Sequence, residues 1–445
     1  MSGSTDLIAA IATPQGSGAV SIIRLSGPGL LEALAKILVI HTDLEFHPRS
    51  LILGHIRGEN GQIIDEVLAV YFPGPNSFTG EDCAEIQGHA GAVVPRLVLA
   101  AILEAGARLA RPGEFTQRAF LNNRLSLDQA EAVAELVAAQ SQSEAVLANR
   151  QLAGALKERV NPIAERLISL AASLTVILDF DEPWDANSQL NLTQNLAALR
   201  QDLAALLALR REGRIFREGL RIVLAGPPNA GKSSLFNALL GLDRALVSPR
   251  PGTTRDYLEA SVSWAGVKVE LVDTAGLWPE STDELDQLSQ DRARAQMGQA
   301  DLIVWLRDLS APNPSPPPQE AQESGIPILA VWAKADLIAE PAPNSLAISA
   351  KTGQGLAQLK DEAIKLLGLN FDQPPDLVPN FRHQKALEKT SQLVNAAVKA
   401  LEEGEPPDII TLEIVDALET LGQITGRVMT EDLLTEVFSN FCLGK

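Results

Sequence analysis

The residues best suited to chemistry form the run Gly226-Pro-Pro-Asn-Ala-Gly231-Lys232-Ser233, which reads G-x-x-x-x-G-K-S. An apolar run, 221–225, precedes it, and a helix-like segment, 234–240, follows it. Its glycines let backbone N–H groups curl around a phosphate, and the helix N-terminus adds positive potential. Lys232 would reach the β- and γ-phosphates, and the Ser233 hydroxyl would ligate Mg²⁺. These flanks favour a phosphate-binding loop over a simple strand–helix turn that binds nothing.

Four further segments downstream would complete a nucleotide site. In the polar loop 252–256, a threonine can place its hydroxyl on Mg²⁺ beside the γ-phosphate. A strand-like run, 267–272, ends in an aspartate that can hold Mg²⁺ through water and a glycine whose N–H can meet the γ-phosphate. Two more apolar runs lead into the segments 333–336 and 349–351. The order of the five segments is that of the translation-factor-like GTPases. It predicts GTP contacts from Asn229, Ala230, Gly231, Lys232, Ser233, Ser234, Thr253, Thr254, Asp273, Thr274, Ala275, Gly276, Lys334, Asp336, Ser349, Ala350 and Lys351.

Selection of guanine rests on Asp336, whose carboxylate can accept hydrogen bonds from guanine N1–H and the 2-amino group, which adenine does not offer. Lys334 can lay its aliphatic stem along the base, and Ser349 and Ala350 would meet its O6 side. One residue departs from the usual pattern, because Ala333 stands where these GTPases carry an asparagine. One unmade buried hydrogen bond costs roughly 1–3 kcal/mol. We still expect GTP to be preferred over ATP, because Asp336 is present.

The hydrolytic machinery differs from that of Ras-type switches, because Leu277 replaces the glutamine that orients water there. A leucine can neither orient nor polarise water, so the group that does must come from elsewhere. Acidic candidates follow at Glu280, Asp283, Glu284 and Asp286, most of them in what reads as a solvated loop. Positive charge for the transition state could come from Arg250, from Arg255, or from a monovalent cation held by oxygen ligands such as Asn229.

Composition describes an ordinary globular chain. Its 445 residues predict about three domains. We find no uninterrupted apolar run long enough for a bilayer, and no basic leader with a cleavage pattern. Two cysteines, Cys83 and Cys442, form no disulfide framework, which fits a reducing cytoplasm. A net charge of −19 argues against coating nucleic acid by bulk electrostatics.

Changes in the pattern of apolar and polar residues divide the chain into four stretches. Residues 1–121 mix short strand-like runs with turns, and 122–217 read as helical. The second stretch includes a leucine seam, from Leu192 to Leu206, in a helix that should end at Gly213. Residues 218–371 hold the nucleotide segments, and 372–445 return to helical periodicity. The nucleotide domain therefore reads as inserted into a helical domain.

Several blocks lie outside the general nucleotide pattern: Ala12-Thr-Pro-Gln-Gly16 with Ile23-Arg-Leu-Ser-Gly27, Phe72-Pro-Gly-Pro-Asn-Ser-Phe-Thr-Gly-Glu-Asp82, Arg111-Pro-Gly-Glu-Phe115 and the terminal Phe441-Cys-Leu-Gly-Lys445. Together with 226–234, they make the chain resemble the MnmE (TrmE) family of tRNA modification GTPases along essentially its full length. The resemblance implies a multidomain fold of α/β and α class. It comprises an N-terminal α+β folate-binding and dimerisation domain, an all-α helical domain, and a Ras-like P-loop α/β G domain inserted in the helical one.

The same resemblance implies a function and its partners. The family forms a cytoplasmic homodimer that works with the flavoprotein MnmG, as a heterotetramer or larger assembly. Together they add a carboxymethylaminomethyl group at C5 of the wobble uridine of certain tRNAs. GTP is hydrolysed with Mg²⁺, K⁺ supports dimerisation of the G domains, and 5-formyltetrahydrofolate or a related derivative supplies one carbon.

By motif match, the resemblance also assigns residues to roles. Mg²⁺ would meet Ser233 and Thr254. K⁺ would meet Asn229 and Thr253, together with backbone carbonyls near Ser248 and Arg250, and Ser248 is also counted among the GTP contacts. Asp286 is the first choice for the general acid/base and Glu284 the second, and Cys442 is assigned to the modification chemistry. The folate-binding positions would be Arg24, Glu85, Arg124 and Lys445.

A second hypothesis is a GTP-switched assembly or scaffold protein, such as a ribosome-biogenesis factor, in which hydrolysis only controls binding. The folate-type blocks and the Cys-Leu-Gly-Lys end favour the enzyme, because a pure switch needs neither. A membrane-remodelling GTPase is not favoured, because no basic amphipathic segment supports it.

Overall fold

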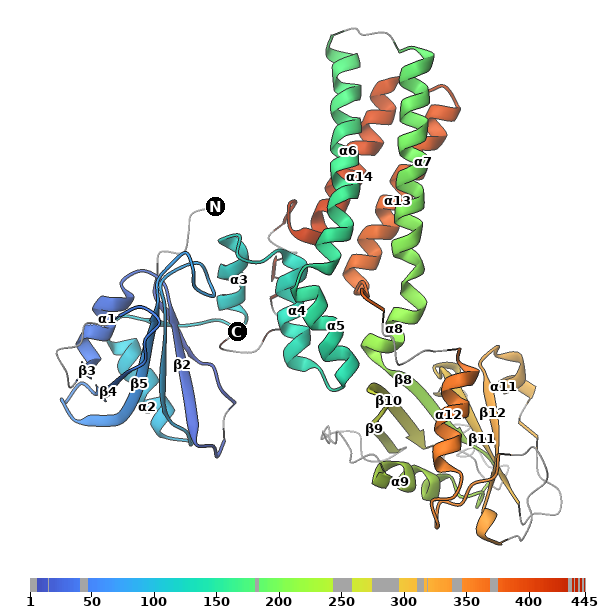
Figure 1. Cartoon of the computed structure of the whole chain (residues 1–445), viewed down its shortest axis with the longest axis horizontal. Helices are drawn as coiled ribbons and strands as arrows, with labels where there is room; N and C mark the ends of the chain where they lie inside the picture. Colours follow the sequence, from blue (N-terminus) through green and yellow to red (C-terminus); the bar gives the residue numbers. More distant parts are fainter. Residues whose placement is uncertain are drawn as a thin grey trace, which may run out of the picture. The chain divides into compact units, whose positions relative to one another are not determined.

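The computed structural model describes residues 6–14, 16–40, 47–180, 184–242, 258–273, 296–309, 316–317, 319–337, 346–368, 375–430, 434–435, 437–438, 441 and 444. The chain forms two compact units (Figure 1). Unit 1 comprises Met1–Val137, Gln151–Ala204 and Phe381–Lys445, and unit 2 comprises Ala138–Arg150 and Ala205–Asn380. Each unit contains segments that are far apart in the sequence, and each is described by itself below.

The N-terminal part of unit 1 is a seven-stranded sheet in the order β3-β4-β5-β6-β2-β1-β7, antiparallel except for the pair β1–β7. Alternating burial along β5 reflects a sheet with one covered face, and residues of α1 and α2 join the strands in one apolar core. The elements are β1 (Ile8–Ile11), β2 (Val20–Ser26), α1 (Leu30–Ile37), β3 (Leu38–Ile40), β4 (Ile52–Arg57), β5 (Ile63–Phe72), β6 (Cys83–His89), α2 (Val94–Glu104) and β7 (Arg108–Leu109).

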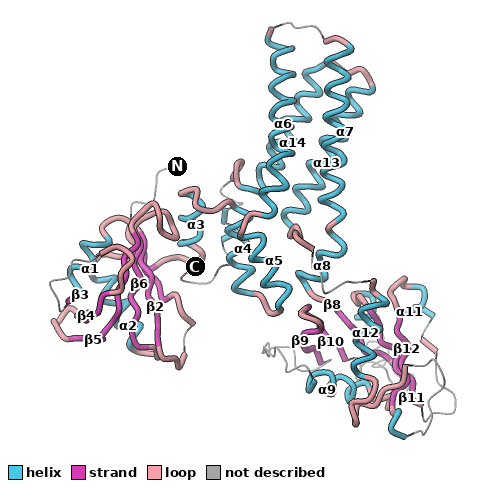
Figure 2. Tube along the Cα trace, viewed as in Figure 1, coloured by secondary structure: helices cyan, strands magenta, loops and turns pink. Residues whose placement is uncertain are grey.

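The rest of unit 1 is helical: α3 (Glu114–Leu121), α4 (Leu127–Ala138), α6 (Ala155–Asp179), α7 (Ala186–Ala208), α13 (Phe381–Glu402) and α14 (Pro407–Thr425). The long helices α6, α7, α13 and α14 form a bundle (Figure 2). The predicted leucine seam of α7 is buried at Leu192, Leu196, Leu199, Leu203 and Leu206. The predicted end at Gly213 is wrong. The helix α7 stops at Ala208, and Gly213 lies inside α8 (Arg210–Glu218), where an added Cβ would meet a Val378 methyl carbon at 2.5 Å.

Among the described residues, one helix, α6, is long and apolar enough by composition to cross a membrane. This is weak evidence for a membrane span, because core helices of soluble proteins have the same length and composition. The buried residues Val160, Ile163, Leu167, Leu170 and Leu174 recur at helical spacing along one side of α6. That pattern is typical of a bundle helix.

Unit 2 contains a five-stranded sheet in the order β12-β11-β8-β10-β9, parallel except for the pair β9–β10. β8 lies at its centre, with β10 on one side and β11 on the other, so the strand order reverses there. In such sheets ligands bind beyond the carboxyl ends of the strands at this point. The elements are α5 (Gln142–Leu152), α8, β8 (Leu220–Ala225), α9 (Lys232–Leu242), β9 (Leu258–Trp264), β10 (Val267–Asp273), β11 (Leu302–Asp308), α11 (Gln319–Glu323), β12 (Ile328–Ala333), η1 (Ala335–Leu337) and α12 (Leu356–Leu366).

Candidate functional site

The predicted phosphate loop lies between β8 and α9, at the reversal point of the sheet. Its backbone requires glycine at Gly226, where φ is 152° and an added Cβ would lie 2.6 Å from the Leu306 carbonyl oxygen. Gly231 has φ 97°, and Asn229, although not glycine, has φ 63°. A left-handed residue between two such glycines gives the tight curl that a phosphate cradle needs.

A buried positive charge lies inside this loop. Lys232 is 4% exposed, and its Nζ donates to the carbonyl oxygens of Gly226 and Pro227, both at 2.9 Å. Burial lowers the pKa of Lys232, while the carboxylate of Asp273, itself buried at the end of β10, acts in the opposite direction. The predicted lysine and aspartate are therefore close enough to interact. Of the other predicted loop residues, Ser233 is the second residue of α9, and Ala230 packs in the apolar core.

Beside the loop is a cavity of about 230 Å³ that collects residues from three of the five predicted segments. It is lined by Gly231, Ser234, Leu235, Ala333, Lys334, Asp336, Leu337, Ile348, Ala350 and Lys351. A backbone hydrogen bond joins two of these segments, because the Ala335 N–H donates to the Ile348 carbonyl at 3.0 Å. The predicted guanine-binding residues thus converge next to the phosphate loop.

Asp336 is exposed and held in place by a buried neighbour. The Ser349 hydroxyl, in a fully buried side chain, donates to Asp336 Oδ1 at 2.7 Å. This hydrogen bond holds the pKa of Asp336 below its ordinary value, so the carboxylate remains ionised as an acceptor. The sequence prediction placed Ser349 against the base. The structure shows it contacting the aspartate.

Lys334 is held by a residue that the sequence reasoning missed. Its φ is 65°, and its Nζ lies 2.6 Å from the Asp308 carboxylate, at the end of β11. An aspartate at the carboxyl end of a parallel strand was the signal that could have revealed this partner. Ala333 is buried, and its Cβ lies 4.0 Å from where a Cβ on Gly231 would stand. The base-binding and phosphate loops therefore meet at Ala333, where no polar side chain can join them.

Several predicted site residues lie outside the described residues: Ser248, Arg250, Thr253, Thr254, Thr274, Ala275, Gly276, Glu284, Asp286, Cys442 and Lys445. The same holds for Arg255, Leu277, Glu280 and Asp283. The roles assigned to them stay predictions.

Three of the four predicted folate residues are described, and two of them touch. Arg24 on β2 lies opposite Glu85 on β6, and its Nε and Nη2 donate to Glu85 Oε1 at 3.1 and 2.8 Å. The guanidinium also lies 5.2 Å from the ring centre of Phe78. Arg124 donates from Nε to the carbonyl of Ser77, one residue before that ring. The loop 73–82 therefore connects Arg124 to the Arg24–Glu85 pair.

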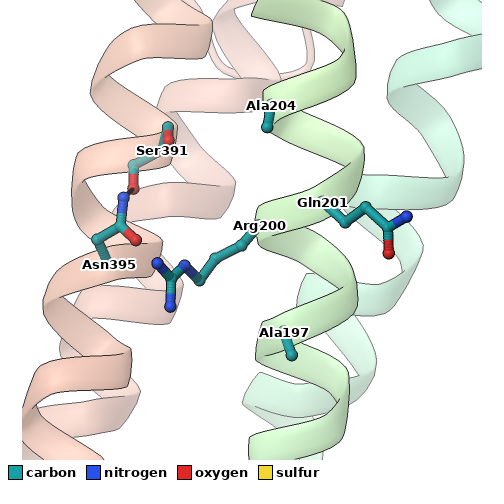
Figure 3. A pocket seen from close by; sticks show the side chains of 6 residues that line it. All are labelled: Ala197, Arg200, Gln201, Ala204, Ser391 and Asn395. Carbon is teal, nitrogen blue, oxygen red and sulfur yellow. Dashed lines mark hydrogen bonds between the residues drawn. The ribbon is translucent and has the colours of Figure 1, made fainter.

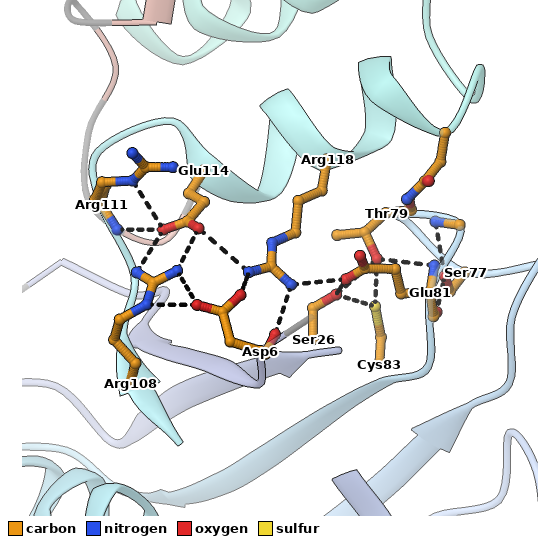
Figure 4. Close-up of polar contacts among 12 residues, drawn as sticks. Asp6, Ser26, Ser77, Thr79, Glu81, Cys83, Arg108, Arg111, Glu114 and Arg118 are labelled. Carbon is orange, nitrogen blue, oxygen red and sulfur yellow. Dashed lines mark hydrogen bonds and ion pairs between the residues drawn. The ribbon is translucent and has the colours of Figure 1, made fainter. Parts of the chain in front are cut away.

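The block Arg111–Phe115 forms the centre of a polar network (Figure 4). The Glu114 carboxylate accepts from Arg108, from Arg118 and from the Arg111 N–H. Burial alone would raise the pKa of Glu114, but these hydrogen bonds outweigh it and hold the pKa at about 2. Arg118 also binds Asp6 and Glu81, and Glu81 binds Ser26. The block therefore has a structural role: it ties α3 to the sheet.

A second hollow, of about 420 Å³, lies between α7 and α13 and holds none of the predicted residues (Figure 3). Arg200 extends from α7 toward Asn395 of α13 and is the one charged residue in a lining that otherwise comprises Ala197, Gln201, Ala204, Ser391 and Asn395.

Comparison with known proteins covers nearly the whole chain. The MnmE helical domain model matches residues 127–442, and the model of the GTP-binding protein TrmE N-terminus matches residues 7–124. The tRNA modification GTPase MnmE of Syntrophus aciditrophicus is 41% identical, over 99% of both chains. That of Bordetella parapertussis is 41% identical, over 98% of this chain and 99% of the relative. The G domain of the T. maritima FeoB iron transporter is 24% identical over 33% of this chain and 98% of that chain, with a TM-score of 0.26.

Proposed function

The chain belongs to the MnmE family of tRNA modification GTPases, and on that basis we propose that it acts with the flavoprotein MnmG on the wobble uridine of certain tRNAs. The proposed product carries a carboxymethylaminomethyl group at C5. The observation that carries the GTPase part is the cavity in which Gly231, Asp336 and Ala350 meet beside the buried Lys232.

The oxygen donors near the phosphate loop fit Mg²⁺, which prefers hard oxygen ligands. Ser233 lies in the first turn of α9, and the Asp273 carboxylate is buried at the end of β10. Mg²⁺ would be held by Ser233 and Thr254, and when bound it neutralises charge on the phosphates. Lys232 holds the β/γ-phosphate end of the nucleotide, and Asp336 orients the base.

We propose K⁺ as the second cation, held by Asn229 and Thr253 together with backbone carbonyls near Ser248 and Arg250. Asn229 is exposed on the loop, and its side chain has no hydrogen-bond partner among the described residues. A cation there would supply the positive charge that Leu277 cannot. Asp286, or failing it Glu284, would activate water, and K⁺ would favour dimerisation of the G domains.

We propose that a tetrahydrofolate derivative such as 5-formyltetrahydrofolate binds near Arg24, Glu85, Arg124 and Lys445. An arginine and a carboxylate beside the Phe78 ring suit a pterin and its glutamyl carboxylates. Gly444 comes close to β1, because an added Cβ would lie 2.6 Å from the Ile11 carbonyl. That approach supports the inclusion of Lys445. The protein would act as a cytoplasmic homodimer, in a heterotetramer or larger assembly with MnmG, with Cys442 taking part in the modification.

GTP turnover in KCl and in NaCl tests the catalytic proposal. We expect clearly faster turnover in KCl than in NaCl. Asn229→Ala should lose this difference between the salts, and Lys232→Ala should lose turnover altogether. Equal slow rates in both salts would count against the cation mechanism and favour the scaffold hypothesis.

A further inference from the structure

Helix α5 belongs to both units, since Gln142–Arg150 lie in unit 2 and the last two residues in unit 1. Its first turn is capped firmly. The Ser141 hydroxyl accepts from the Glu144 N–H at 3.2 Å, and the Glu144 carboxylate accepts from the Gln140 N–H at 2.6 Å. This is a variant of the capping box, and it fixes where the helix begins.

The N-terminal end of α5 holds the turn of the β9–β10 hairpin. That turn is Ala265–Gly266, with φ 47° and 82°, as in the primed turns that join twisted strands. The Ser143 N–H donates to the Gly266 carbonyl at 3.0 Å, and the Ser143 hydroxyl donates to the same oxygen. Leu147, one turn along α5, is buried in one core with Trp264 and Val267. The start of α5 is therefore held against the hairpin turn, and we expect the two to move together.

The opposite ends of this hairpin run into the predicted nucleotide-sensing segments. The segment with Thr253 and Thr254 leads directly into β9, and β10 ends at Asp273, just before Gly276. The two strands are paired along their whole length, from Leu258–Asp273 to Trp264–Val267. The paired strands therefore link Leu258 and Asp273, which are next to these segments in the sequence, to the turn at Gly266.

The C-terminal end of α5 is joined to α4 by two reciprocal bonds. The Gln151 amide donates to the Asp128 carbonyl at 3.0 Å, and the Gln129 amide donates to the Leu152 carbonyl at 2.8 Å. These two hydrogen bonds join the C-terminal end of α5 to the N-terminal end of α4. We therefore expect α4 to move when α5 moves.

The helix α4 is in turn tied to the bundle by a partly buried ion pair. Glu131 accepts from Arg382 at 2.7 and 2.8 Å and lies 2.7 Å from His383, in the first turn of α13. Arg382 also donates to the carbonyls of Gln423 and Ile424 at the end of α14. Arg382 therefore joins α4 to both α13 and α14, and we expect a displacement of α4 to act on both of these helices.

We propose that α5 couples the nucleotide state to the helical part of unit 1, and that Ser143 is the positioning residue at its nucleotide-side end. The inference goes beyond hydrolysis and modification, and it rests on the proposed nucleotide site. Neither Ser143 nor Gly266 lines the nucleotide cavity, so a change at Ser143 separates coupling from binding.

The test compares Ser143→Asp with Gln142→Asp. Both variants place a carboxylate in the first turn of α5, where negative charge favours the helix. Both side chains lie near Gly266, but among the described residues only Ser143 donates a side-chain hydrogen bond to the Gly266 carbonyl, and an aspartate at 143 cannot make that bond. Hydrogen exchange of the α4 amides is measured on the full chain with GDP and with a non-hydrolysable GTP analogue. Binding of a fluorescent GTP analogue is measured in parallel.

In the wild-type protein and in Gln142→Asp, exchange in α4 should differ between the two nucleotides, and in Ser143→Asp that difference should be lost. Analogue affinity should stay within about twofold in both variants, because neither Gln142 nor Ser143 is among the residues that line the candidate nucleotide cavity. Ser143→Thr, which keeps the hydroxyl, should restore the difference, and Ser143→Ala should reduce it in part.

A full nucleotide-dependent difference in Ser143→Asp, or no difference in a wild-type protein that binds the analogue normally, would overturn the coupling role alone. A wild-type protein that fails to bind the analogue would overturn the nucleotide site together with the inference built on it.

Discussion

At the scale of single residues, we propose that guanine recognition depends on Asp336 as an ionised acceptor. Asp336→Asn replaces one acceptor oxygen with an amide donor, which opposes the N–H groups of guanine but matches the C2 carbonyl of xanthine. GTP affinity should fall at least about 100-fold, since one hydrogen bond is lost and the other is no longer charge-assisted, and XTP affinity should rise. Titration with both nucleotides measures this change. The control Asp361→Asn, exposed on α12, should bind GTP normally.

The junction at Ala333 allows a gain-of-affinity prediction. Ala333→Asn would place an amide where the base-binding loop meets the phosphate loop. One new buried hydrogen bond should tighten GTP binding roughly fivefold to tenfold. Calorimetric titration against Ala330→Asn, which changes an exposed residue of the same strand, measures the effect. Unchanged or weaker binding in Ala333→Asn would show that the two loops do not need joining there.

At the scale of elements, Glu114 stabilises the contact between α3 and the sheet, and its effect depends on pH. Its pKa is lowered from 4.5 to about 2 in the folded protein, so the folded state binds fewer protons than the unfolded state between these values. The stabilisation is therefore complete above about pH 4.5, and it is lost as the pH falls toward 2.

Glu114→Gln should reduce the free energy of unfolding by about 3 kcal/mol at pH 7, and the difference from wild type should shrink as the pH approaches 3. Denaturant titrations at pH 7 and pH 3 measure both values. Glu104→Gln, an exposed glutamate at the end of α2, serves as the control and should change little. A deficit in Glu114→Gln that is equal at both pH values would contradict an electrostatic origin.

Many of the helices and strands could be predicted from the spacing of apolar residues and glycines. The glycine spacing at 226–231 predicted a phosphate loop between a strand and a helix, because only glycine tolerates the close approach at Gly226. The leucine seam predicted the core of α7 but misplaced its end, because a glycine stops an isolated helix but also permits close packing, as Gly213 does against Val378. The partners Asp308 for Lys334 and Ser349 for Asp336 depend on which strand ends are neighbours. Spacing along the chain does not contain that information.

At the scale of the whole molecule, the insertion of the nucleotide segments between helical segments has a physical consequence. Unit 2 interrupts unit 1 in the sequence, at 138–150 and at 205–380, so a nucleotide-dependent change can act on unit 1 through the chain itself. The N-terminal sheet, with its Arg24–Glu85 pair, lies in unit 1 together with the bundle. We therefore expect nucleotide state, the proposed folate binding and tRNA modification to be linked, although the residues involved lie in different parts of the chain.

We propose above all that this GTPase takes part in modification of the tRNA wobble uridine through a guanine site built on Asp336. Mass spectrometry of tRNA nucleosides tests it most directly, in cells that lack the protein and are complemented with the wild type or with Asp336→Asn. The account predicts that the carboxymethylaminomethyl group is missing without the protein, returns with the wild type, and stays missing with Asp336→Asn. A fully modified wobble uridine in cells without the protein would contradict it.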